Sequence, residues 1–367
     1  CNHPEVLEAD AKAAAEYGMF YPMGARAMSG ETEQHLQLER ELADFVGKES
    51  AYLLNFGYQG MLSTIDALVS RHDVIVYDSN SHACIVDGVR LHMGKSFMFR
   101  HNDMDSFEKN IKRATKVAEE NGGGILVITE GVFGMTGQQG KLKEIAEFKK
   151  QYSFRLLVDD AHGFGTLGKT GAGAGEEQGC QDQIDVYFST FAKSMAGFGA
   201  FIAGNKEIIR YLKFNLRSQI FAKSLTMPMV IGGLKRLELL RTRPEIKAKL
   251  WENVEKLQNG LLERGFNLGN SNTCVTPVFM QGTPVEATLL VKDLRENFGI
   301  FTSVVVYPVI PKGSILLRLI PTASHTDAEI NETLAAFEAI HDKLVNGVYK
   351  EQAEKLLAEQ GLEFKPL

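Results

Sequence analysis

The chain of 367 residues is 44% hydrophobic and 23% charged, which is the composition of an ordinary globular protein and excludes a disordered or fibrous one. Its 40 lysines and arginines against 46 aspartates and glutamates leave a net charge of −6, without a dense basic block. Nucleic acid is therefore a poor candidate partner and small molecules are better ones. No apolar run approaches the roughly 20 residues that span a bilayer, so no membrane span is expected.

From about residue 50 to residue 204, short β-branched or aromatic runs alternate with amphipathic stretches. The strands expected from this pattern are Ala51–Phe56, Val74–Asp78, Gly124–Thr129, Arg155–Asp159, Asp185–Thr190 and Ala200–Ala203. Strands that alternate with helices of this length predict an α/β fold with a mostly parallel central sheet and helices on both faces. Ligands of such sheets bind beyond the carboxyl ends of the strands, so the residues that follow each strand are the candidates for chemistry.

After Pro228 the pattern changes to long charged helices and then to a smaller α+β arrangement. The elements expected here are the helices Met229–Arg243, Glu245–Arg264, Val285–Phe298 and Asp327–Leu344, and the strands Thr276–Gln281, 301–309 and Ser314–Ile320. We therefore expect a large domain over residues 1–228, a small C-terminal α+β domain with its preceding long helices over residues 229–346, and a solvated tail over residues 347–367.

The four cysteines, at positions 1, 84, 180 and 274, show no CxxC spacing. This argues against a disulfide framework and against a structural zinc site, so no metal is expected, and it fits a reducing cytoplasm. The chain starts at Cys1 without an initiator methionine, so we expect that an upstream segment is missing and that any targeting signal in it is invisible.

Residues 163–170, Gly-Phe-Gly-Thr-Leu-Gly-Lys-Thr, match the P-loop pattern GxxxxGK(S/T) and also GxGxxG. A P-loop needs a strand that runs directly into the first glycine and a helix that begins at the lysine, because the amides at the helix start bind the phosphates. Here residues 159–162, Asp-Asp-Ala-His, lie between the apolar run that ends at Val158 and Gly163, and the glycine-rich run Gly171–Gly175 follows the motif. A glycine-rich loop beside an active site is the better interpretation, and a P-loop nucleotide enzyme is a remote alternative.

Chemically distinctive side chains follow three of the predicted strands. Asp159 and His162 follow one strand, Lys193 follows another, and His82 follows a third. Because parallel strands end at the same edge of a sheet, we expect these side chains to converge on one crevice. A pyridoxal phosphate site needs this set: a lysine that forms a Schiff base, an acid that keeps the pyridine nitrogen protonated, and groups that orient the ring.

A phosphate cradle is available at Asn55-Phe56-Gly57-Tyr58, where a strand closes as a helix begins, because free amides and the helix dipole favour an anion. Taken singly, the residues have plainer interpretations. If Lys193 is considered by itself, it is best interpreted as a solvated charge. By the same standard, His82 is a helix cap or a core residue, and residues 159–162 form a capping turn or half of a metal site. The combination favours the cofactor site.

These residues belong to an ordered set of motifs. The set comprises Gly24-Ala25-Arg26 followed by His35-Leu-Gln-Leu-Glu39; Phe56-Gly57-Tyr58; Asp78-x-x-x-His82-Ala-Cys-Ile-x-Asp-Gly88; Glu130-Gly-Val-Phe-Gly-Met-Thr-Gly137; Val158-Asp-Asp-Ala-His-Gly163; Thr190-Phe-Ala-Lys193; and Arg318-x-x-x-x-Ala323-x-His325-Thr326. By this set, from about Pro4 to Leu344, the chain resembles the α-oxoamine synthases among the fold-type I pyridoxal-phosphate transferases. That family includes serine palmitoyltransferase, glycine C-acetyltransferase and 8-amino-7-oxononanoate synthase.

The resemblance implies a role for each catalytic residue. Lys193 is implied to be the Schiff-base lysine and the base that removes the Cα proton. Asp159 is implied to pair with the pyridine nitrogen, His162 to hydrogen-bond the phenolic oxygen, and His82 to stack on the ring, where a flat side chain gains contact area. The other implied assignments are Gly57, Tyr58, Thr190 and Ser224 as cofactor-binding, and Arg318, Lys223 and Arg26 as substrate-binding. A guanidinium fork suits Arg318 to the amino-acid carboxylate.

The implied reaction condenses an amino acid with an acyl thioester. Loss of the α-proton gives a carbanion that attacks the thioester, the carboxylate leaves as CO2, and a 2-amino ketone is released. The acyl donor is expected to be an acyl-CoA or an acyl-carrier-protein thioester. The resemblance also implies a homodimer with active sites shared between the subunits.

Some positions depart from the family pattern. Ala25 and Ala192 stand where relatives carry serine, and 133–137, Phe-Gly-Met-Thr-Gly, stands for Phe-Ser-Met-Asp/Glu-Gly. The contacts that the serine hydroxyls make in relatives are therefore in question for this chain. The run Phe221–Ser224 places Lys223 where relatives carry a small residue in a segment donated by the neighbouring subunit.

The amino-acid sequence of segments 100–104 and 130–137 looks closest to that of bacterial serine palmitoyltransferases. This favours a long-chain acyl thioester and an amino acid larger than glycine. The extra cation of Lys223 and the lost hydroxyls lead to a sharper hypothesis, in which the amino acid carries an anionic side chain such as the sulfonate of cysteate. A solvent-exposed lysine is the plainer interpretation of Lys223.

The function expected from these observations is the first step of sphingolipid or sulfonolipid synthesis in the cytoplasm. Glycine C-acetyltransferase or 8-amino-7-oxononanoate synthase is the alternative within the family. A catalytically inactive partner subunit is a non-enzyme alternative, although such a copy would not need Lys193. A peripheral membrane contact would suit an enzyme that makes lipid, but no stretch of the sequence demands it.

Overall fold

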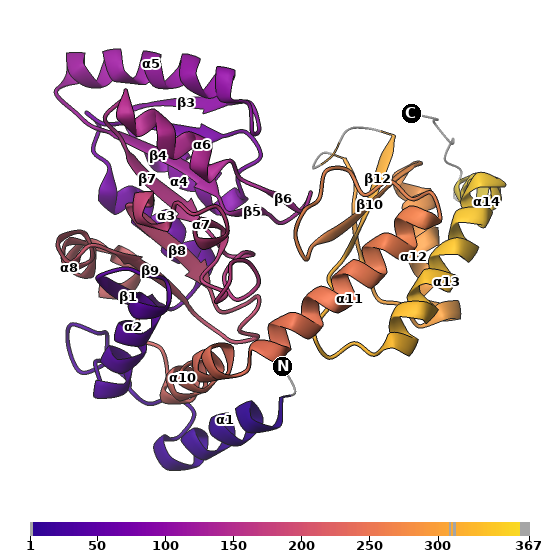
Figure 1. The fold of residues 1–367 in the computed structure, drawn as a ribbon, viewed down its shortest axis with the longest axis horizontal. Helices are drawn as coiled ribbons and strands as arrows, with labels where there is room; N and C mark the ends of the chain where they lie inside the picture. Colours follow the sequence, from indigo (N-terminus) through magenta and orange to yellow (C-terminus); the bar gives the residue numbers. More distant parts are fainter. Residues whose placement is uncertain (1–2, 308–309, 311–312, 360–367) are drawn as a thin grey trace. The chain divides into compact units, whose positions relative to one another are not determined.

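The chain forms two compact units in the computed structural model, which describes residues 3–307, 310 and 313–359. The large unit comprises Cys1–Phe133 and Gln139–Pro244, and the small unit comprises Gly134–Gln138 and Glu245–Leu367. The elements of both units are labelled in Figure 1.

A seven-stranded sheet forms the centre of the large unit (Figure 1). Its strands, in spatial order, are β1 (Ser50–Leu54), β9 (Ala200–Gly204), β8 (Val186–Thr190), β7 (Arg155–Asp159), β4 (Ile125–Glu130), β2 (Val74–Asp78) and β3 (Lys95–Phe99). Within this sheet β9 is antiparallel to both of its neighbours, whereas β8, β7, β4, β2 and β3 are parallel. The sequence-based prediction of a mostly parallel sheet is therefore confirmed.

Helices cover both faces of this sheet. On one face, α3 (Gly57–Leu68), α4 (Ala83–Leu91) and α8 (Lys206–Asn215) bury apolar side chains such as Met61, Ile85 and Leu212 against the strands. On the other face, α5 (Met104–Asn121) packs on β2 and β3. The remaining elements are α1 (Pro4–Tyr17), α2 (Glu33–Phe45), α6 (Leu142–Glu147), α7 (Ala174–Glu177), α9 (Arg217–Ile220), α10 (Met227–Thr242), the short helices Phe148–Lys150 and Gln181–Gln183, and the hairpin of β5 (Val132–Phe133) and β6 (Gln138–Gln139).

The small unit has its own sheet and core. Its antiparallel strands are ordered β10 (Thr276–Gln281), β12 (Ser314–Leu319) and β11 (Ser303–Val305), and its helices are α11 (Pro244–Glu263), α12 (Pro284–Phe298), α13 (Asp327–Val345) and α14 (Val348–Glu359). Capping boxes start α12 at Thr283 and α13 at Thr326, which fixes where both helices begin. The strand expected over residues 301–309 is limited to β11, and positions 308–309 lie outside the described residues.

The observed organisation differs from the expected domains at two places. The unit boundary lies at Pro244 instead of residue 228, because α10 packs on α1 and α2 of the large unit. The expected tail over residues 347–367 contains α14, which packs on α12 and α13 and buries Tyr349 and Ala353. Positions 360–367 of that tail lie outside the described residues.

The glycine-rich motif does not adopt P-loop geometry. Residues 161–170 form turns and bends, and the next helix, α7, begins only at Ala174. Lys169 and Thr170 therefore do not start a helix, and the amide array that a P-loop offers to phosphate is not built here.

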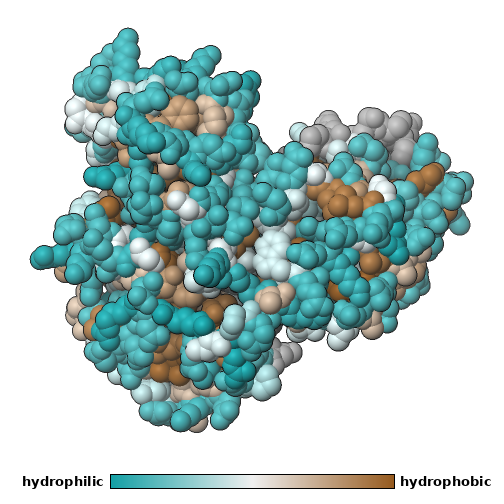
Figure 2. Space-filling view, viewed as in Figure 1, coloured by the Kyte–Doolittle hydropathy of each residue, from teal (hydrophilic) through white to brown (hydrophobic). Residues whose placement is uncertain are grey.

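The surface of the protein is mainly hydrophilic on the face shown in Figure 2, where apolar residues form separate patches. Among the helices of the described residues, none combines the length and the apolar character needed to cross a membrane.

Candidate active site

The site is built where four neighbouring parallel strands end. In the order β8, β7, β4 and β2 they lie side by side, and the register pairs Glu130 with Asp159 and Asp159 with Phe188. The loops that follow these strands carry Lys193, Asp159 and His82 to one edge of the sheet, and the charge of Lys193 acts on both other residues. The structure thus brings together the three residues that the sequence placed after strands.

Asp159 is a buried carboxyl at the end of β7, and its side chain is 6% exposed. Its Oδ1 accepts the amide of Ala161 at 3.2 Å, and the thiol of Cys84 lies 3.8 Å from Oδ2. Burial raises the pKa of Asp159 to about 6, against the opposing effects of these donors and of the Lys193 cation. A second cation placed here, such as a protonated pyridine nitrogen, would stabilise the ionised carboxylate further.

His82 is the residue that precedes α4, and its position is fixed on two sides. Its backbone N–H donates to the Glu130 carboxyl, and its Nδ1 accepts the amide of Cys84 at 3.3 Å. Burial and the nearby Lys193 cation lower the pKa of His82, which favours the neutral imidazole. A neutral flat ring held in this way is suited to stack on an aromatic ligand.

Lys193 lies in a tight turn between β8 and β9. The Thr190 hydroxyl donates to the Gly199 carbonyl at 3.0 Å, and the Lys193 carbonyl accepts the amide of Ala196 at 2.9 Å. Ala196 has a φ of 42°, a left-handed conformation that a side chain rarely adopts and that tends to occur at functional sites. The turn leaves Lys193 exposed.

His162 follows Asp159 in a turn and is half-buried. Its carbonyl accepts the hydroxyl of Thr166 at 2.8 Å, which stabilises the turn after β7. The side chain therefore starts from the same strand end as Asp159, in agreement with the sequence-based placement of both residues after one strand.

The start of α3 offers an anion cradle. Phe56 occupies the capping position and its side chain accepts no hydrogen bond from the helix, so the first amides of α3 have no side-chain cap. A Cβ added at Gly57 would lie 3.2 Å from the Thr190 hydroxyl oxygen, a tight contact that would narrow the space between α3 and the end of β8. Tyr58 lies in the first turn of α3, where the helix itself offers its backbone amide no acceptor, and its hydroxyl donates to Asp87.

Together these features fit pyridoxal phosphate. The uncapped helix start beside Thr190 suits its phosphate, the buried Asp159 suits its ring nitrogen, and Lys193 carries the amine that its aldehyde requires.

The remaining predicted residues of the large unit are held by other protein groups. Ser224 donates to the Gly24 carbonyl through its amide at 3.0 Å and its hydroxyl at 3.2 Å. The carbonyl of Lys223 accepts the side chain of Asn55, next to the start of α3, and its ammonium lies 5.4 Å from the centre of the Phe20 ring.

Arg26, expected to bind substrate, lies in a buried ion pair. Its guanidinium contacts Glu39 at 2.7 Å and Glu31 at 3.0 Å, and the side chain of Arg26 is 2% exposed. Because both carboxylates already pair with it, the contacts favour a structural role for Arg26.

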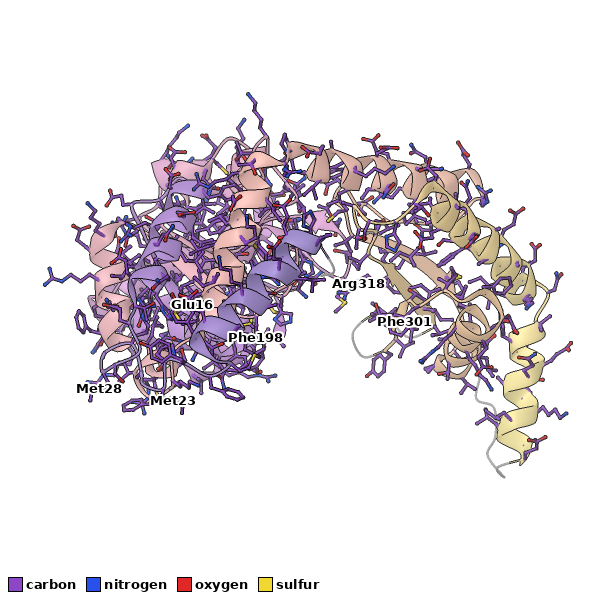
Figure 3. All side chains as sticks on the ribbon, turned by 90° about the horizontal axis from the view of Figure 1, so that it is seen from below. Glu16, Met23, Met28, Phe198, Phe301 and Arg318 are labelled. Carbon is purple, nitrogen blue, oxygen red and sulfur yellow. The ribbon has the colours of Figure 1, made fainter. Side chains whose placement is uncertain are left out.

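Arg318 lies on β12 of the small unit (Figure 3). Its Nη1 donates to the carbonyl of Gly134 at 3.0 Å, within the same unit. No acidic side chain of the described residues forms an ion pair with Arg318, and burial lowers its pKa. A half-buried guanidinium of this kind can accept a carboxylate from a ligand.

Two residues of this region stand in the motifs quoted above, but the sequence analysis assigned them no role. Glu130 ends β4 between β7 and β2, and Cys84 lies between His82 and Asp159. The rule that singled out Asp159, namely a polar residue at the end of a predicted strand, applies equally to Glu130, whereas no such rule assigns a contact to Cys84.

A family model described as aminotransferase class I and II matches residues 2–337. The cysteate-C-fatty acyltransferase of Capnocytophaga ochracea is 67% identical over 98% of this chain and 86% of its own length. The serine palmitoyltransferase of Sphingobacterium spiritivorum is 36% identical over 90% of this chain and 81% of its own length.

Solved structures agree with this similarity. The serine palmitoyltransferase of Sphingomonas wittichii superposes with a TM-score of 0.88 at 30% identity, covering 94% of this chain and 85% of that one. A serine palmitoyltransferase variant solved with PLP gives a TM-score of 0.86 at 30% identity and covers 95% of this chain and 85% of that one. The 8-amino-7-oxononanoate synthase of Francisella tularensis, at 23% identity, shares the fold with a TM-score of 0.76.

Proposed function

This chain belongs to the class I and II aminotransferase family, and from that premise we propose that it condenses cysteate with a long-chain acyl thioester. The carboxylate of the amino acid leaves as CO2, the thiol leaves from the acyl group, and a 3-oxo long-chain amine that keeps the sulfonate is released. The observation that carries this proposal is the 67% identity, over 98% of the chain, to a cysteate-C-fatty acyltransferase. Serine is the second candidate amino acid, because the serine palmitoyltransferases of Sphingobacterium spiritivorum and Bacteroides ovatus are also similar to this chain, at 36% and 34% identity.

Pyridoxal phosphate, when bound, supplies an aldehyde that captures the amino group and a ring that accepts the electrons of the Cα carbanion. Within the proposal, Lys193 provides the amine for that aldehyde, and its Nζ later takes the proton from Cα. Asp159 holds a negative charge toward the ring nitrogen, His162 donates to the phenolic oxygen, and the imidazole of His82 lies against the ring.

The remaining residues hold the phosphate and the substrates. Gly57, Tyr58, Thr190 and Ser224 form the proposed phosphate site, for which the uncapped start of α3 is the supporting observation. Arg318 is the proposed ligand of the amino-acid carboxylate, and it retains that carboxylate until CO2 leaves. Lys223 is the proposed partner of the sulfonate, because its backbone is tied to Asn55 beside the phosphate cradle.

We propose further that two copies of the chain assemble with shared sites. Met23 and Met28 on the large unit are 73% and 85% exposed, and both protrude from it in Figure 3. Phe221, next to Lys223 in the chain, is 75% exposed. Apolar side chains this exposed are unfavourable in water, and a second copy of the chain is the proposed cover.

The proposed acyl donor is an acyl-CoA or an acyl-carrier-protein thioester.

The amino acid is tested by side-by-side turnover of cysteate, serine, glycine and alanine with palmitoyl-CoA. We expect cysteate to give the highest kcat/KM, and Lys223→Gln to raise KM for cysteate about tenfold while that for serine is unchanged, since a hydrogen bond to a charged group is lost. Lys116→Gln, on the exposed face of α5, is the matched control.

Preference for serine or glycine would contradict the choice of cysteate. Preference for glycine would favour glycine C-acetyltransferase, and preference for alanine with a pimeloyl thioester would favour 8-amino-7-oxononanoate synthase. The purified protein should absorb visible light, and Lys193→Ala should abolish both this absorbance and turnover. A colourless, active protein would contradict the whole mechanism.

A further inference from the structure

A carboxyl that the proposed mechanism does not use lies beside the cofactor aspartate. Glu130 ends β4, and the parallel pairing of β4 with β7 sets it in register with Asp159. Both side chains are buried, at 6% exposure each. Residues in register on neighbouring strands project to the same face of a sheet, so the two carboxyls are buried neighbours.

Glu130 also contacts the residue that precedes α4. Its Oε1 accepts the backbone N–H of His82, while the Nδ1 of the same histidine lies 3.0 Å from the Cys84 sulfur. The amide of His82 is one of the donors at a helix start that the helix itself leaves unpaired. Glu130 therefore fixes the backbone of His82, and Cys84 fixes its ring.

The charges that face Glu130 come from every neighbouring element. Asp159 on β7 and Asp78 at the end of β2 are acidic, the Lys193 side chain after β8 is cationic, and His82 carries a lowered pKa that favours its neutral form. Two buried carboxyls that face one lysine cation do not both ionise readily, because each charge opposes the other in a region with little water.

The hydrogen-bond donors and charges around each carboxyl determine which of the two is ionised. Asp159 accepts the Ala161 amide, lies within reach of the Cys84 thiol and interacts with Lys193, and all three favour its ionised form. Burial and the charge of Asp159 raise the pKa of Glu130 well above its usual range, while burial raises that of Asp159 to about 6. At neutral pH the negative charge of the pair therefore resides on Asp159.

We propose that Glu130 is a positioning residue that holds the stacking histidine through the amide of His82 and, by staying neutral, leaves the charge of the carboxyl pair on Asp159. Glu130 does not touch the cofactor in this proposal. It acts on the cofactor through His82 and Asp159, the two residues that would contact the ring.

Three variants of the holoenzyme test this role through cofactor binding. Glu130→Gln keeps an acceptor for the His82 amide and has no ionisable proton, so it imitates a neutral glutamic acid. Glu130→Leu has similar volume but no acceptor, and Glu130→Asp keeps an ionisable group but withdraws it by one methylene. The readouts are the dissociation constant for pyridoxal phosphate, the pH midpoint of the visible absorbance, and thermal melting.

We expect Glu130→Gln to keep the dissociation constant within about twofold and the pH midpoint within about 0.3 units of the wild type. Glu130→Leu and Glu130→Asp should weaken cofactor binding about tenfold or more, because the His82 amide loses its acceptor, and they should move the pH midpoint. Asp159→Asn provides the reference for loss of the charge itself.

Two results would overturn the proposal. If Glu130→Gln moves the pH midpoint by about one unit or more, as Asp159→Asn is expected to do, then Glu130 carries the charge. If Glu130→Leu and Glu130→Asp both bind the cofactor with the wild-type constant and midpoint, then Glu130 positions nothing. Should Glu130→Leu fail to fold, the Gln and Asp variants decide. These readouts use the cofactor alone, so they do not depend on which amino acid the enzyme prefers.

Discussion

Asp160 shows how the chain uses two consecutive aspartates for different purposes. Asp159 is the last residue of β7 and Asp160 is the next residue of the chain, and the two carboxyls have different hydrogen-bond partners. The carboxyl of Asp160 accepts the Ala174 amide at 2.8 Å and the Tyr187 hydroxyl at 3.0 Å. A Cβ added at Gly131 would lie 2.0 Å from a carboxyl oxygen of Asp160, so the glycine makes room for this buried group. Asp160 thus organises the loop after β7.

Asp160 also gives the stability of the protein a pH dependence. Burial raises the pKa of Asp160 from 3.8 to about 7. An acid whose folded-state pKa is raised contributes stability that is complete below the unfolded pKa and is lost as the pH rises through the folded pKa. We therefore expect the free energy of unfolding to fall between about pH 4 and pH 7, by up to about 4 kcal/mol from this group.

Urea unfolding of Asp160→Asn across this pH range is the measurement. The variant should show a smaller slope than the wild type, although not a flat one, because the raised pKa of Asp159 acts in the same direction. Asp182→Asn, at an exposed position, is the control and should keep the wild-type slope. An unchanged slope in Asp160→Asn would show that this carboxyl is not the source.

At the scale of elements, the strands with β-branched runs were predictable and the edge strand was not. β2, β4, β7 and β8 consist largely of buried apolar residues, which is the pattern of a sheet covered on both faces. β3 reads Lys-Ser-Phe-Met-Phe and is largely exposed, so it lacks that pattern. The reversed direction of β9 has no sequence signal, because alternation of strand and helix does not record direction.

The candidate site was predictable to the extent that it follows strand ends. Asp159, His82 and Lys193 each come after a strand, and the parallel order of β8, β7, β4 and β2 brings these ends together. Contacts that depend on side-chain packing, such as that of Cys84 with His82, require coordinates. The ion pairs of Arg26 likewise come from α2 and the loop before it, and no spacing rule identifies them.

The start of α3 yields a prediction at the scale of one helix. Phe56 has the extended backbone of a capping residue, with φ −141° and ψ 142°, but its side chain accepts no hydrogen bond. In Phe56→Ser, the hydroxyl should cap the helix, which stabilises the cofactor-free protein by about 1 kcal/mol. The same hydroxyl competes with phosphate for the amides of α3, so the affinity for pyridoxal phosphate should fall about tenfold.

Thermal melting of the cofactor-free protein and titration with pyridoxal phosphate measure the two effects. Phe56→Ala is the matched control. It also removes the ring whose centre lies 5.0 Å from the centre of the Phe198 ring, but it adds no cap. If Phe56→Ser and Phe56→Ala bind the cofactor equally well, the amides at the start of α3 do not bind the phosphate.

At the scale of the whole molecule, each unit has a core of its own. The core of the large unit contains Met61 and Phe188, and that of the small unit contains Leu290 and Phe337. The boundary between the units was misplaced from sequence because α10 and α11 both read as charged helices. α14 was expected to be a solvated tail because lysines and glutamates recur along it, although Tyr349 and Ala353, four residues apart, form one buried stripe.

Because the cores are separate, the two units should differ in how they respond to a core mutation. Tyr349 is 1% exposed, and its hydroxyl donates to Asp293 at 2.6 Å within the small unit. Tyr349→Ala removes this ring and should destabilise the small unit by about 3–5 kcal/mol. The protein's single tryptophan, Trp251, lies on α11 of the small unit and reports its unfolding, whereas the visible absorbance of the bound cofactor reports the large unit.

In urea, we expect Tyr349→Ala to move the tryptophan midpoint to lower concentration and to leave the cofactor absorbance midpoint unchanged. Tyr349→Phe, which keeps the ring, should lower the free energy of unfolding of the small unit by only about 1 kcal/mol, since Lys343 and Asn297 still contact Asp293. Equal shifts of both midpoints in Tyr349→Ala would mean that the two units unfold as one cooperative system, so that stability is shared across the boundary at Pro244 in spite of the separate cores.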